Sequence, residues 1–470
     1  MSVHEHWLNS NRVLIASAAF AAYATALAVY TGGADQVWAI WAAVAYGATT
    51  AVLLVARMIR RWIVIPPLAP LLISLGGALA GPLIWLSTKV SPTPEVQVIS
   101  RSAAQLLKHG TPYLPTSQMD SWLSYNPYLP LMAVFGMPRA MGATGLFGDP
   151  RLWMAVVSLV LLAIAFWLAS PHLACRSCSR HVLLATVFAA SSPVIAFPLS
   201  VGITDPPVIA LLLVTLALAA RPGRRSMWAG VVLGVASAMK STAWPAIPVI
   251  AGLMATRDGI KAMWRFVGVA FLLAVALAAA MAPAALSDPT SFLQNTVLFP
   301  LGLTEHRTPA ASPLPGHLLA MTGSAGHAAA VGLLLVAGLG FALSLIIRPP
   351  ADARGAAFRL ALGLAVMFTL APATRWGYFV YPIGLVGWIA ITDRGPIRMR
   401  RLNPALAGGV PAGAVPAAAM PGAGLSVPSG SSGPPSPAPE LAAARLKKLV
   451  PLGYGQLAAR GGGTTRLGSR

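Results

Sequence analysis

Long apolar runs recur along most of the chain, and their length is the feature that most restricts its fold. A helix needs about 20 apolar residues to cross the hydrocarbon core of a bilayer. The runs cover residues 12–31, 37–56, 62–87, 151–170, 182–199, 205–220, 226–255, 264–286, 326–347, 357–373 and 376–392. Only 10% of the residues are charged, against about 25% in a soluble domain. The sequence therefore predicts an all-α, polytopic transmembrane helical bundle of about 11–13 spans.

Clusters of basic residues separate the apolar runs and indicate the sidedness of the predicted bundle. The net charge is +21, and the clusters include "ARMIRRW", "RPGRR", "TRDGIKAMWR" and "DRGPIRMRR". The positive-inside rule places such segments in the cytoplasm. Because these residues punctuate the ends of spans and form no single patch, we expect the lipid bilayer, and no nucleic acid, as their partner. The protein is thus expected in the cell membrane, with both termini in the cytoplasm.

The basic clusters are mutually consistent only under two conditions. Residues 88–150 must form a long outer loop containing short helices, so that "YLPLMAVFGMPRAMG" is a re-entrant or surface segment and not a span. Residues 226–255, about 30 residues, must form a helical pair, with Lys240 near its outer turn. A second long outer loop is expected over residues 287–325. Long ordered loops often carry function.

Composition divides the chain into three predicted parts. Residues 1–61 are expected to form an N-terminal two-span hairpin, and residues 62–393 the transmembrane core. Residues 394–470 are rich in Pro, Gly and Ala and end in a basic stretch. Such a composition cannot bury enough apolar surface to order itself, so a disordered cytoplasmic tail is predicted. Cys175 and Cys178 fall in a short basic loop and are interpreted as incidental thiols, and not as half of a zinc site or a redox pair.

Acidic residues are rare, and two of them at the outer face are candidates for catalysis. An acid at a membrane boundary is costly unless it has a partner. Glu95 lies a few residues beyond a span, where a rigidly held carboxylate can accept a proton from a hydroxyl. The structural alternatives are pairing with Arg101 on one face of a short helix and simple solvation. Asp205 precedes two prolines at the start of an apolar run, so helix capping by Thr204 or Asp205 is the structural alternative there.

Several cations at the outer face are candidates for binding an anion. Lys240 lies between two apolar half-helices, where it either snorkels to the interface or binds a phosphate as a point charge. Arg375 lies on a short outer turn and breaks the positive-inside trend, which is unfavourable without an anionic partner. Interfacial anchoring by the nearby aromatic residues is its structural alternative. His306 and Arg307 add positive charge to the second outer loop.

Several known motifs are absent from the sequence. It contains no P-loop, no HExxH, no GxSxG and no His-rich cluster. With so few carboxylates, a dedicated divalent-metal site is difficult to build. We therefore expect no cofactor and no metal, and an ATP-driven pump is disfavoured.

The residues together resemble a known family. The segments that carry the resemblance are "PEVQVI", "AAQLLKHGTPYLP", "YNPYLPLMAVFGMPRAMGATGLFGDPRLW", "ITDPPVIALLLVTLALAARPGRRSMWAGVVLGVASAMKSTAWPAIPVI", "LGLTEHRTPAASPLPGH" and "TRWGYFVYP". In this order they are similar to polytopic glycosyltransferases of the GT-C superfamily that use polyprenyl-phosphate sugars, and in particular to actinobacterial mannosyltransferase-like integral membrane proteins. This family more often has Asp at the position of Glu95, and usually one span before the large loop.

The resemblance implies a function and roles for individual residues. A sugar, with mannose favoured, would pass with inversion from a polyprenyl-phosphate donor to an acceptor hydroxyl on a glycan, glycolipid or protein at the outer face. Glu95 takes the position of the general base, and Asp205 that of the second outer acid. Lys240 and Arg375 fall where the donor phosphate would be held.

Further substrate contacts are expected from the two outer loops. We expect His306 and Arg307 to support binding of the donor phosphate. The residues expected to contact substrate are Gln97, Tyr113, Tyr125 and Asn126. The alternatives are a multi-span secondary transporter, which requires broken helices near the midplane of the bilayer, and a catalytically inactive membrane scaffold.

Overall fold

The computed structural model describes residues 11–58, 66, 68–170, 176–221 and 225–392. The structure is 81% helical, and no strand occurs in these ranges. The expected all-α fold is therefore confirmed. Cys175, the side chain of Cys178 and the expected tail from residue 394 lie outside the part that is described.

The N-terminal helices α1 (Asn11–Tyr30) and α2 (Gly33–Met58) pack against each other along their length. The chain reverses at Gly33, whose φ of 63° is readily accessible only to glycine. Buried Trp38 of α2 donates a hydrogen bond to the carbonyl of Ala78 (2.7 Å). That carbonyl lies in the next span, Leu68–Lys89, formed by α3 (Leu68–Leu75), the π-turn η2 (Gly76–Ala80) and α4 (Gly81–Lys89). The N-terminal pair is thus fastened to the rest of the bundle.

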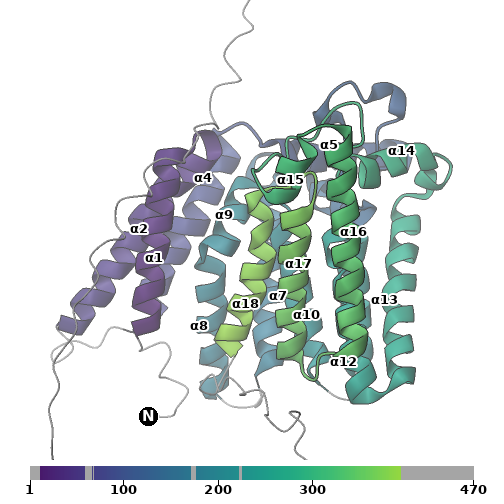
Figure 1. Cartoon of the computed structure of the whole chain (residues 1–470). Helices are drawn as coiled ribbons and strands as arrows, with labels where there is room; N and C mark the ends of the chain where they lie inside the picture. Colours follow the sequence, from purple (N-terminus) through teal and green to yellow (C-terminus); the bar gives the residue numbers. More distant parts are fainter. Residues whose placement is uncertain (1–10, 59–65, 67, 171–175, 222–224, 393–470) are drawn as a thin grey trace, which may run out of the picture. The chain divides into compact units, whose positions relative to one another are not determined.

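Residues 88–150 contain only short helices after the amphipathic helix α5 (Pro94–His109). The short elements are η3 (Thr116–Gln118), η4 (Trp122–Ser124), η5 (Pro130–Gly136), α6 (Met137–Ala140) and η6 (Gly145–Gly148). The piece "YLPLMAVFGMPRAMG" is thus too short in its helical parts to cross a membrane, as expected. Both ends of the loop are held together, because the guanidinium of Arg151 donates to the carbonyl of Leu86 (3.1 Å). Helices α5, α14 and α15 lie at one end of the bundle (Figure 1).

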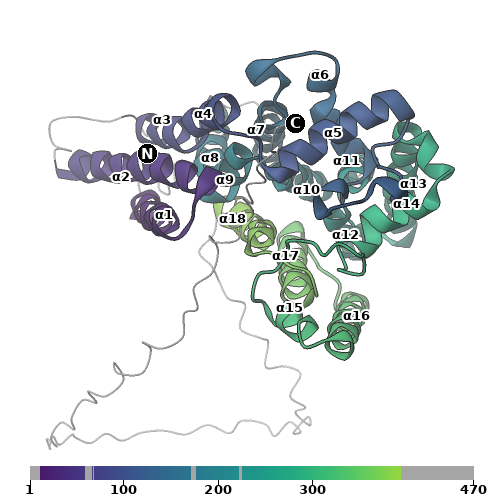
Figure 2. The ribbon, with the colours of Figure 1, turned by 90° about the horizontal axis from the view of Figure 1, so that it is seen from above.

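The other main helices form the body of the bundle around α10 (Asp205–Ala219), all of whose residues are buried. They are α7 (Pro150–Ala169), α8 (Arg176–Ser191), α9 (Pro193–Val201), α11 (Arg225–Met239), α12 (Ala246–Asp258), α13 (Ile260–Met281), α16 (Ser324–Ile347), α17 (Ala353–Leu370) and α18 (Val380–Thr392). The short elements between them are η7 (Ser241–Ala243), η8 (Pro283–Leu286), α14 (Pro289–Leu293), η9 (Gln294–Leu298), α15 (Pro315–Ala320) and η10 (Trp376–Phe379). The view from above shows α10 and α11 among the surrounding helices (Figure 2). A helix that is apolar on every face belongs in such a core.

Seven helices of the described residues are long and apolar enough to cross a membrane. An eighth crossing is formed if the pair α8–α9, bent by 57°, counts as one span. Three shorter apolar helices, over residues 205–219, 227–239 and 376–392, would bring the number to the lower end of the expected range if they also cross. The chain is therefore a multi-pass membrane protein.

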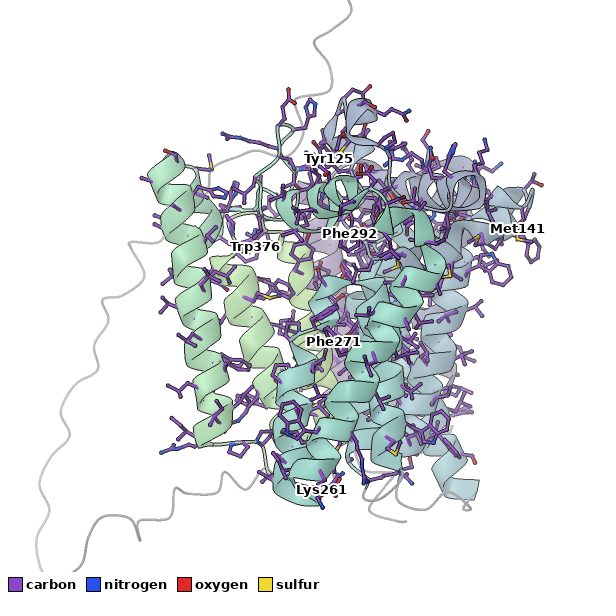
Figure 3. The ribbon with its side chains drawn as sticks, turned by 90° about the vertical axis from the view of Figure 1, so that its right-hand side faces the viewer. Tyr125, Met141, Lys261, Phe271, Phe292 and Trp376 are labelled. Carbon is purple, nitrogen blue, oxygen red and sulfur yellow. The ribbon has the colours of Figure 1, made fainter. Side chains whose placement is uncertain are left out.

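The expected helical pair at residues 226–255 is confirmed. Lys240, at the end of α11, contacts Asp205 at the start of α10, whereas Arg257, at the end of α12, donates to the carbonyl of Ala219 at the other end of α10. Helices α11 and α12 therefore run in opposite directions, with Lys240 at their turn. Lys261, in the first turn of the next helix, lies at the opposite end of the bundle from Tyr125 (Figure 3).

Candidate active site

Glu95 is positioned by the first turn of α5. Thr93 precedes the helix in an extended conformation, and Pro94 occupies its first position, which suits the fixed φ of proline. The hydroxyl of Thr93 donates to the carbonyl of Val201 (3.0 Å) and so fastens the start of α5 to the end of α9. The Glu95 side chain keeps 21% of its surface exposed. A carboxylate held in this way has a fixed direction and remains accessible.

Asp205 begins α10, but it is not used as a cap. Thr204 is the N-cap residue and makes no side-chain capping bond. The Asp205 carboxylate instead accepts a short hydrogen bond from the Lys240 ammonium, which also donates to the Thr204 hydroxyl (3.1 Å). The Asp205 and Lys240 side chains are 1% and 10% exposed, respectively. The pair is thus buried and joins the beginning of α10 to the end of α11.

Arg375 reaches the same place from the turn after α17. An isolated parallel bridge between Ala311 and Thr374 ties this turn to the second outer loop, with the Ser312 amide donating to the Thr374 carbonyl (2.9 Å). The guanidinium of Arg375 then donates to the carboxylate of Glu95 (2.8 Å). Glu95 is therefore the anionic partner that Arg375 requires.

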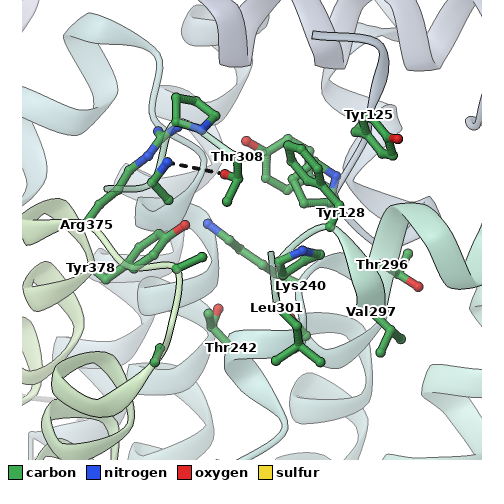
Figure 4. A pocket seen from close by; sticks show the side chains of 18 of the residues that line it. Tyr125, Tyr128, Lys240, Thr242, Thr296, Val297, Leu301, Thr308, Arg375 and Tyr378 are labelled. Carbon is green, nitrogen blue, oxygen red and sulfur yellow. Dashed lines mark hydrogen bonds between the residues drawn. The ribbon is translucent and has the colours of Figure 1, made fainter. Parts of the chain in front are cut away.

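Two tyrosine rings flank the Lys240 ammonium. Its nitrogen lies 5.5 Å from the ring centre of Tyr128 and 5.8 Å from that of Tyr378, which is within the range of a cation–π contact. Figure 4 shows the Lys240 side chain extending toward Tyr378 and Arg375, with Tyr128 beside it. The four charged groups thus converge through α5, α10, the α11–α12 turn and the α17–α18 turn.

A cavity of about 400 Å³ opens at this point. Glu95, Lys240 and Arg375 line its charged part, and Leu334, Met367 and Phe368 contribute to an apolar wall. Ligand sites usually combine a largely apolar lining with a few convergent polar groups. The cavity therefore suits an amphipathic molecule with an anionic group.

Burial and neighbouring charges act in opposite directions on the Glu95 carboxyl. Burial is the largest effect and raises its pKa, whereas the Arg375 guanidinium and the Lys240 ammonium lower it. The net pKa is raised above the ordinary value. A carboxylate with a raised pKa is a better proton acceptor, which is the property that a general base needs.

The comparison with known families decides the class of protein. The family model of glycosyltransferase family 87 matches residues 126–372, more than half of the chain. The chain belongs to glycosyltransferase family 87. This is a GT-C-like polytopic membrane family, so the predicted resemblance to a polytopic membrane glycosyltransferase is confirmed, and this class is favoured over a transporter. No curated protein matches the chain.

The part of the chain that matches family 87 contains Asp205 and Lys240, whereas Glu95 and Arg375 lie on either side of it. The ion pair between Glu95 and Arg375 thus joins the segment before the matched part to the segment after it. Glu95, Lys240 and Arg375 line one cavity, and Asp205 lies behind it as the partner of Lys240. The roles of all four residues are predictions.

The other predicted residues of this family 87 protein lie around the cavity in different ways. Tyr125 lines the cavity, stacked on Phe299 with ring centres 4.5 Å apart. His306 lies with its ring edge-on to Tyr125 at 6.5 Å. Gln97 donates to the carbonyl of Pro92 (2.7 Å) and does not line the cavity. Arg307 lines a neighbouring cavity instead.

Tyr113 and Asn126 are buried and bonded to the backbone of the outer loop. The Tyr113 hydroxyl donates to the carbonyl of Tyr128 (2.9 Å), and the Asn126 side-chain oxygen accepts from the Tyr128 amide (3.1 Å). The backbone amide of Asn126 donates to the side-chain oxygen of Asn295 (2.6 Å). These bonds hold the backbone that carries the Tyr128 ring, so their direct contacts are with the protein.

Sequence reasoning missed Tyr128 and Thr242, both of which line the cavity. Thr242 donates to the hydroxyl of buried Tyr381 (2.7 Å), next to the Lys240 turn. Tyr128 lies in the segment "YNPYLP" and Thr242 in "MKSTAW". No rule of residue spacing distinguishes these two side chains from ones that only pack in the core. No group of three His, Cys, Asp or Glu side chains within metal-binding distance occurs in the described ranges.

Proposed function

We propose that the protein transfers a sugar, with mannose favoured, from a polyprenyl-phosphate donor to an acceptor hydroxyl at the outer face of the membrane, with Glu95 as general base. The observation that carries the proposal is the convergence of Glu95, Lys240 and Arg375 on one amphipathic cavity. A hydroxyl nucleophile needs a positioned base, and a lipid phosphate needs cations at the rim of the membrane.

The donor phosphate is assigned to Lys240 and Arg375. Asp205 already neutralises Lys240, and Glu95 already neutralises Arg375, so the four groups together carry no net charge. A phosphate anion competes most easily for Arg375, because that side chain is 37% exposed whereas Lys240 is 10% exposed. Lys240 then attracts the donor phosphate electrostatically from a fixed position, and the rings of Tyr128 and Tyr378 shield its ammonium group from water.

Donor binding has a consequence for the base. When the phosphate attracts Arg375, the Glu95 carboxylate loses the partner that lowers its pKa. Glu95 becomes a stronger base at the moment when the donor is in place. It accepts the proton of the acceptor hydroxyl while the oxygen attacks the anomeric carbon, and the lipid phosphate leaves from the opposite side. This sequence yields an inverted product.

The apolar wall supports a lipid-linked donor. Leu334 belongs to α16, and Met367 and Phe368 belong to α17, two helices that are long and apolar enough to span the membrane. A prenyl chain leaving the cavity along these side chains stays in an apolar environment. A nucleotide-sugar donor, with a polar base and a pyrophosphate, gains nothing from this wall.

The test is transfer by the purified protein in liposomes supplied with a radiolabelled polyprenyl-phosphate sugar. Glu95→Gln is expected to reduce the rate by roughly 10²–10⁴-fold while the protein remains folded. Glu305→Gln is the matched control, since this exposed carboxylate of the second loop does not line the cavity. Full activity of Glu95→Gln, or transfer from a nucleotide sugar alone, would reject the proposal.

A further inference from the structure

A second cavity of about 750 Å³ lies beside the first, at the same end of the bundle. It is bordered by the second outer loop, α15 and the first turns of α16. Thr308, Ala310 and Ala373 line both cavities, so only this thin wall separates them. The polar side chains of the second cavity include Arg307, His317 and His327, and none of its described lining residues is Asp or Glu.

The basic groups of the second cavity have unused hydrogen-bonding capacity. No side-chain hydrogen bond or ion pair involves Arg307 among the described residues, in contrast to Arg375 in the first cavity. The Nε2 atom of His327 is buried without a partner there, which is costly unless a ligand supplies one. His317 contacts the carbonyl of Pro372 through Nδ1 (2.8 Å). Because a carbonyl only accepts, Nδ1 carries a proton, and the doubly protonated ring can donate to an anion through its free Nε2.

The start of α16 adds positive potential to the same cavity. Gly323 is the N-cap residue and provides no side-chain cap, and both Gly323 and Ser324 line the cavity. The first amide groups of a helix lack intrahelical partners, and the positive end of the helix dipole favours an anion there. An anion at this point therefore has the amides, the arginine and the two imidazoles within one cavity.

The other wall of the cavity is apolar and follows α16 toward the middle of the bundle. Val331, Gly332 and Leu335 line it, and Leu335 is 68% exposed on a helix that can span the membrane. The lining thus changes from basic to apolar along the helix axis. This order matches a lipid with its headgroup at the rim and its chain in the bilayer.

We propose that the second cavity binds the phosphate-bearing headgroup of an anionic membrane lipid through Arg307, His317 and the N-terminus of α16. The shared wall brings this headgroup next to the first cavity. Binding of the lipid headgroup does not depend on Glu95 acting as a base. Only the relevance of this lipid to sugar transfer rests on the proposed function.

The first experiment measures lipid retention by native mass spectrometry of the purified full chain, with phosphatidylglycerol and phosphatidylcholine as probes. The wild type is expected to retain phosphatidylglycerol preferentially. Arg307→Gln is expected to weaken this binding by about fivefold. Arg139→Gln is the matched control, because it removes an exposed arginine charge from the first outer loop, at a position that lines neither cavity.

A second pair of variants tests the apolar wall by size. Gly332 and Gly338 both lie on α16, and a Cβ atom added at either position meets no heavy atom within 4 Å. Gly332→Phe fills the cavity and is expected to remove most of the retained phosphatidylglycerol. Gly338→Phe, which lies outside the cavity, is expected to leave it unchanged. Unaltered melting temperatures exclude misfolding as the cause.

Three results would overturn the proposal. Equal retention of both phospholipids would show no preference for an anionic headgroup. An equal loss in Arg307→Gln and Arg139→Gln would indicate a general effect of surface charge. Inorganic phosphate that binds with the same dependence on Arg307, without any lipid preference, would assign the cavity to the free anion. Because the measurement is binding, a failure here is distinct from a loss of transfer in Glu95→Gln.

Discussion

The two ion pairs of the candidate active site differ in burial and in what holds them. The Lys240–Asp205 pair joins two adjacent helices of the core, and its side chains are 10% and 1% exposed. The Arg375–Glu95 pair joins the turn after α17 to helix α5 of the first outer loop. The two residues are 280 positions apart in sequence, and their side chains are 37% and 21% exposed. The first pair has the properties of a permanent part of the fold. The second has those of a contact that a ligand can open.

The largest effect is expected from breaking the buried pair. Lys240→Met leaves the Asp205 carboxylate buried without a counter-charge, which should reduce the free energy of unfolding by about 3–5 kcal/mol. Thermal unfolding of the purified variant measures the loss. A melting temperature equal to that of the wild type would show that this pair is not part of the scaffold.

The double variant Lys240→Met/Asp205→Leu sharpens this test. Replacing both charges by apolar side chains of similar size removes the unpaired carboxylate, and such replacements are often neutral or stabilising. The melting temperature should therefore recover, whereas sugar transfer should not, because the phosphate still lacks Lys240. Recovery of transfer would exclude Lys240 from donor binding.

The exposed pair should contribute far less to stability and more to substrate use. Arg375→Gln is expected to change the free energy of unfolding by no more than about 1 kcal/mol. The apparent KM for the polyprenyl-phosphate donor should rise by about tenfold, the loss of one charge-assisted contact to phosphate. Initial rates over a range of donor concentrations measure the change. An unaltered KM would make Arg375 a structural partner of Glu95 only.

The pH profile of the same variant gives an independent result. Arg375 lowers the pKa of Glu95, so its removal should raise that pKa further. Because the base must be deprotonated to act, a larger fraction of the enzyme is inactive at a given acidic pH. The acid limb of the rate profile should therefore move to higher pH in Arg375→Gln. A shift toward lower pH would contradict the assignment of Glu95 as the base.

The contrast between the pairs also explains what the sequence could predict. The apolar runs and basic clusters are local signals, and they correctly indicated the helical bundle and the turn at Lys240. A short helix at Glu95 was the structural alternative, and in the structure Glu95 does lie on a helix, which starts at Pro94 after Thr93. The partner of Glu95 was not predictable in this way, since Arg375 approaches it only through the folding of the intervening chain. The local candidate, Arg101, instead donates to the carbonyl of Ser124 (3.1 Å).

Side-chain directions in the loops were also not predictable from local sequence. Arg307 and His306 are neighbours in sequence, but Arg307 lines the second cavity and His306 contacts Tyr125. A loop without regular structure carries no periodicity from which the direction of a side chain follows. Asn126 is polar and lies in a loop, yet the bonds of its side chain to the backbone at Pro112 and Tyr128 make it part of the loop framework.

The smallest effect is expected from Tyr378→Phe, which changes a ring beside the buried pair. Tyr378→Phe keeps the aromatic face at 5.8 Å from the Lys240 nitrogen, so the melting temperature should stay close to that of the wild type. Tyr378→Leu removes the face and should cost about 0.5–2 kcal/mol, the range of a cation–π contact from exposed to desolvated sites. Thermal unfolding of both variants distinguishes the contribution of the Tyr378 ring to stability from that of its hydroxyl. If Phe and Leu destabilise equally, the Tyr378 hydroxyl is the stabilising group, and the Lys240 ammonium is held by Asp205, Thr204 and the Tyr128 ring without the Tyr378 face.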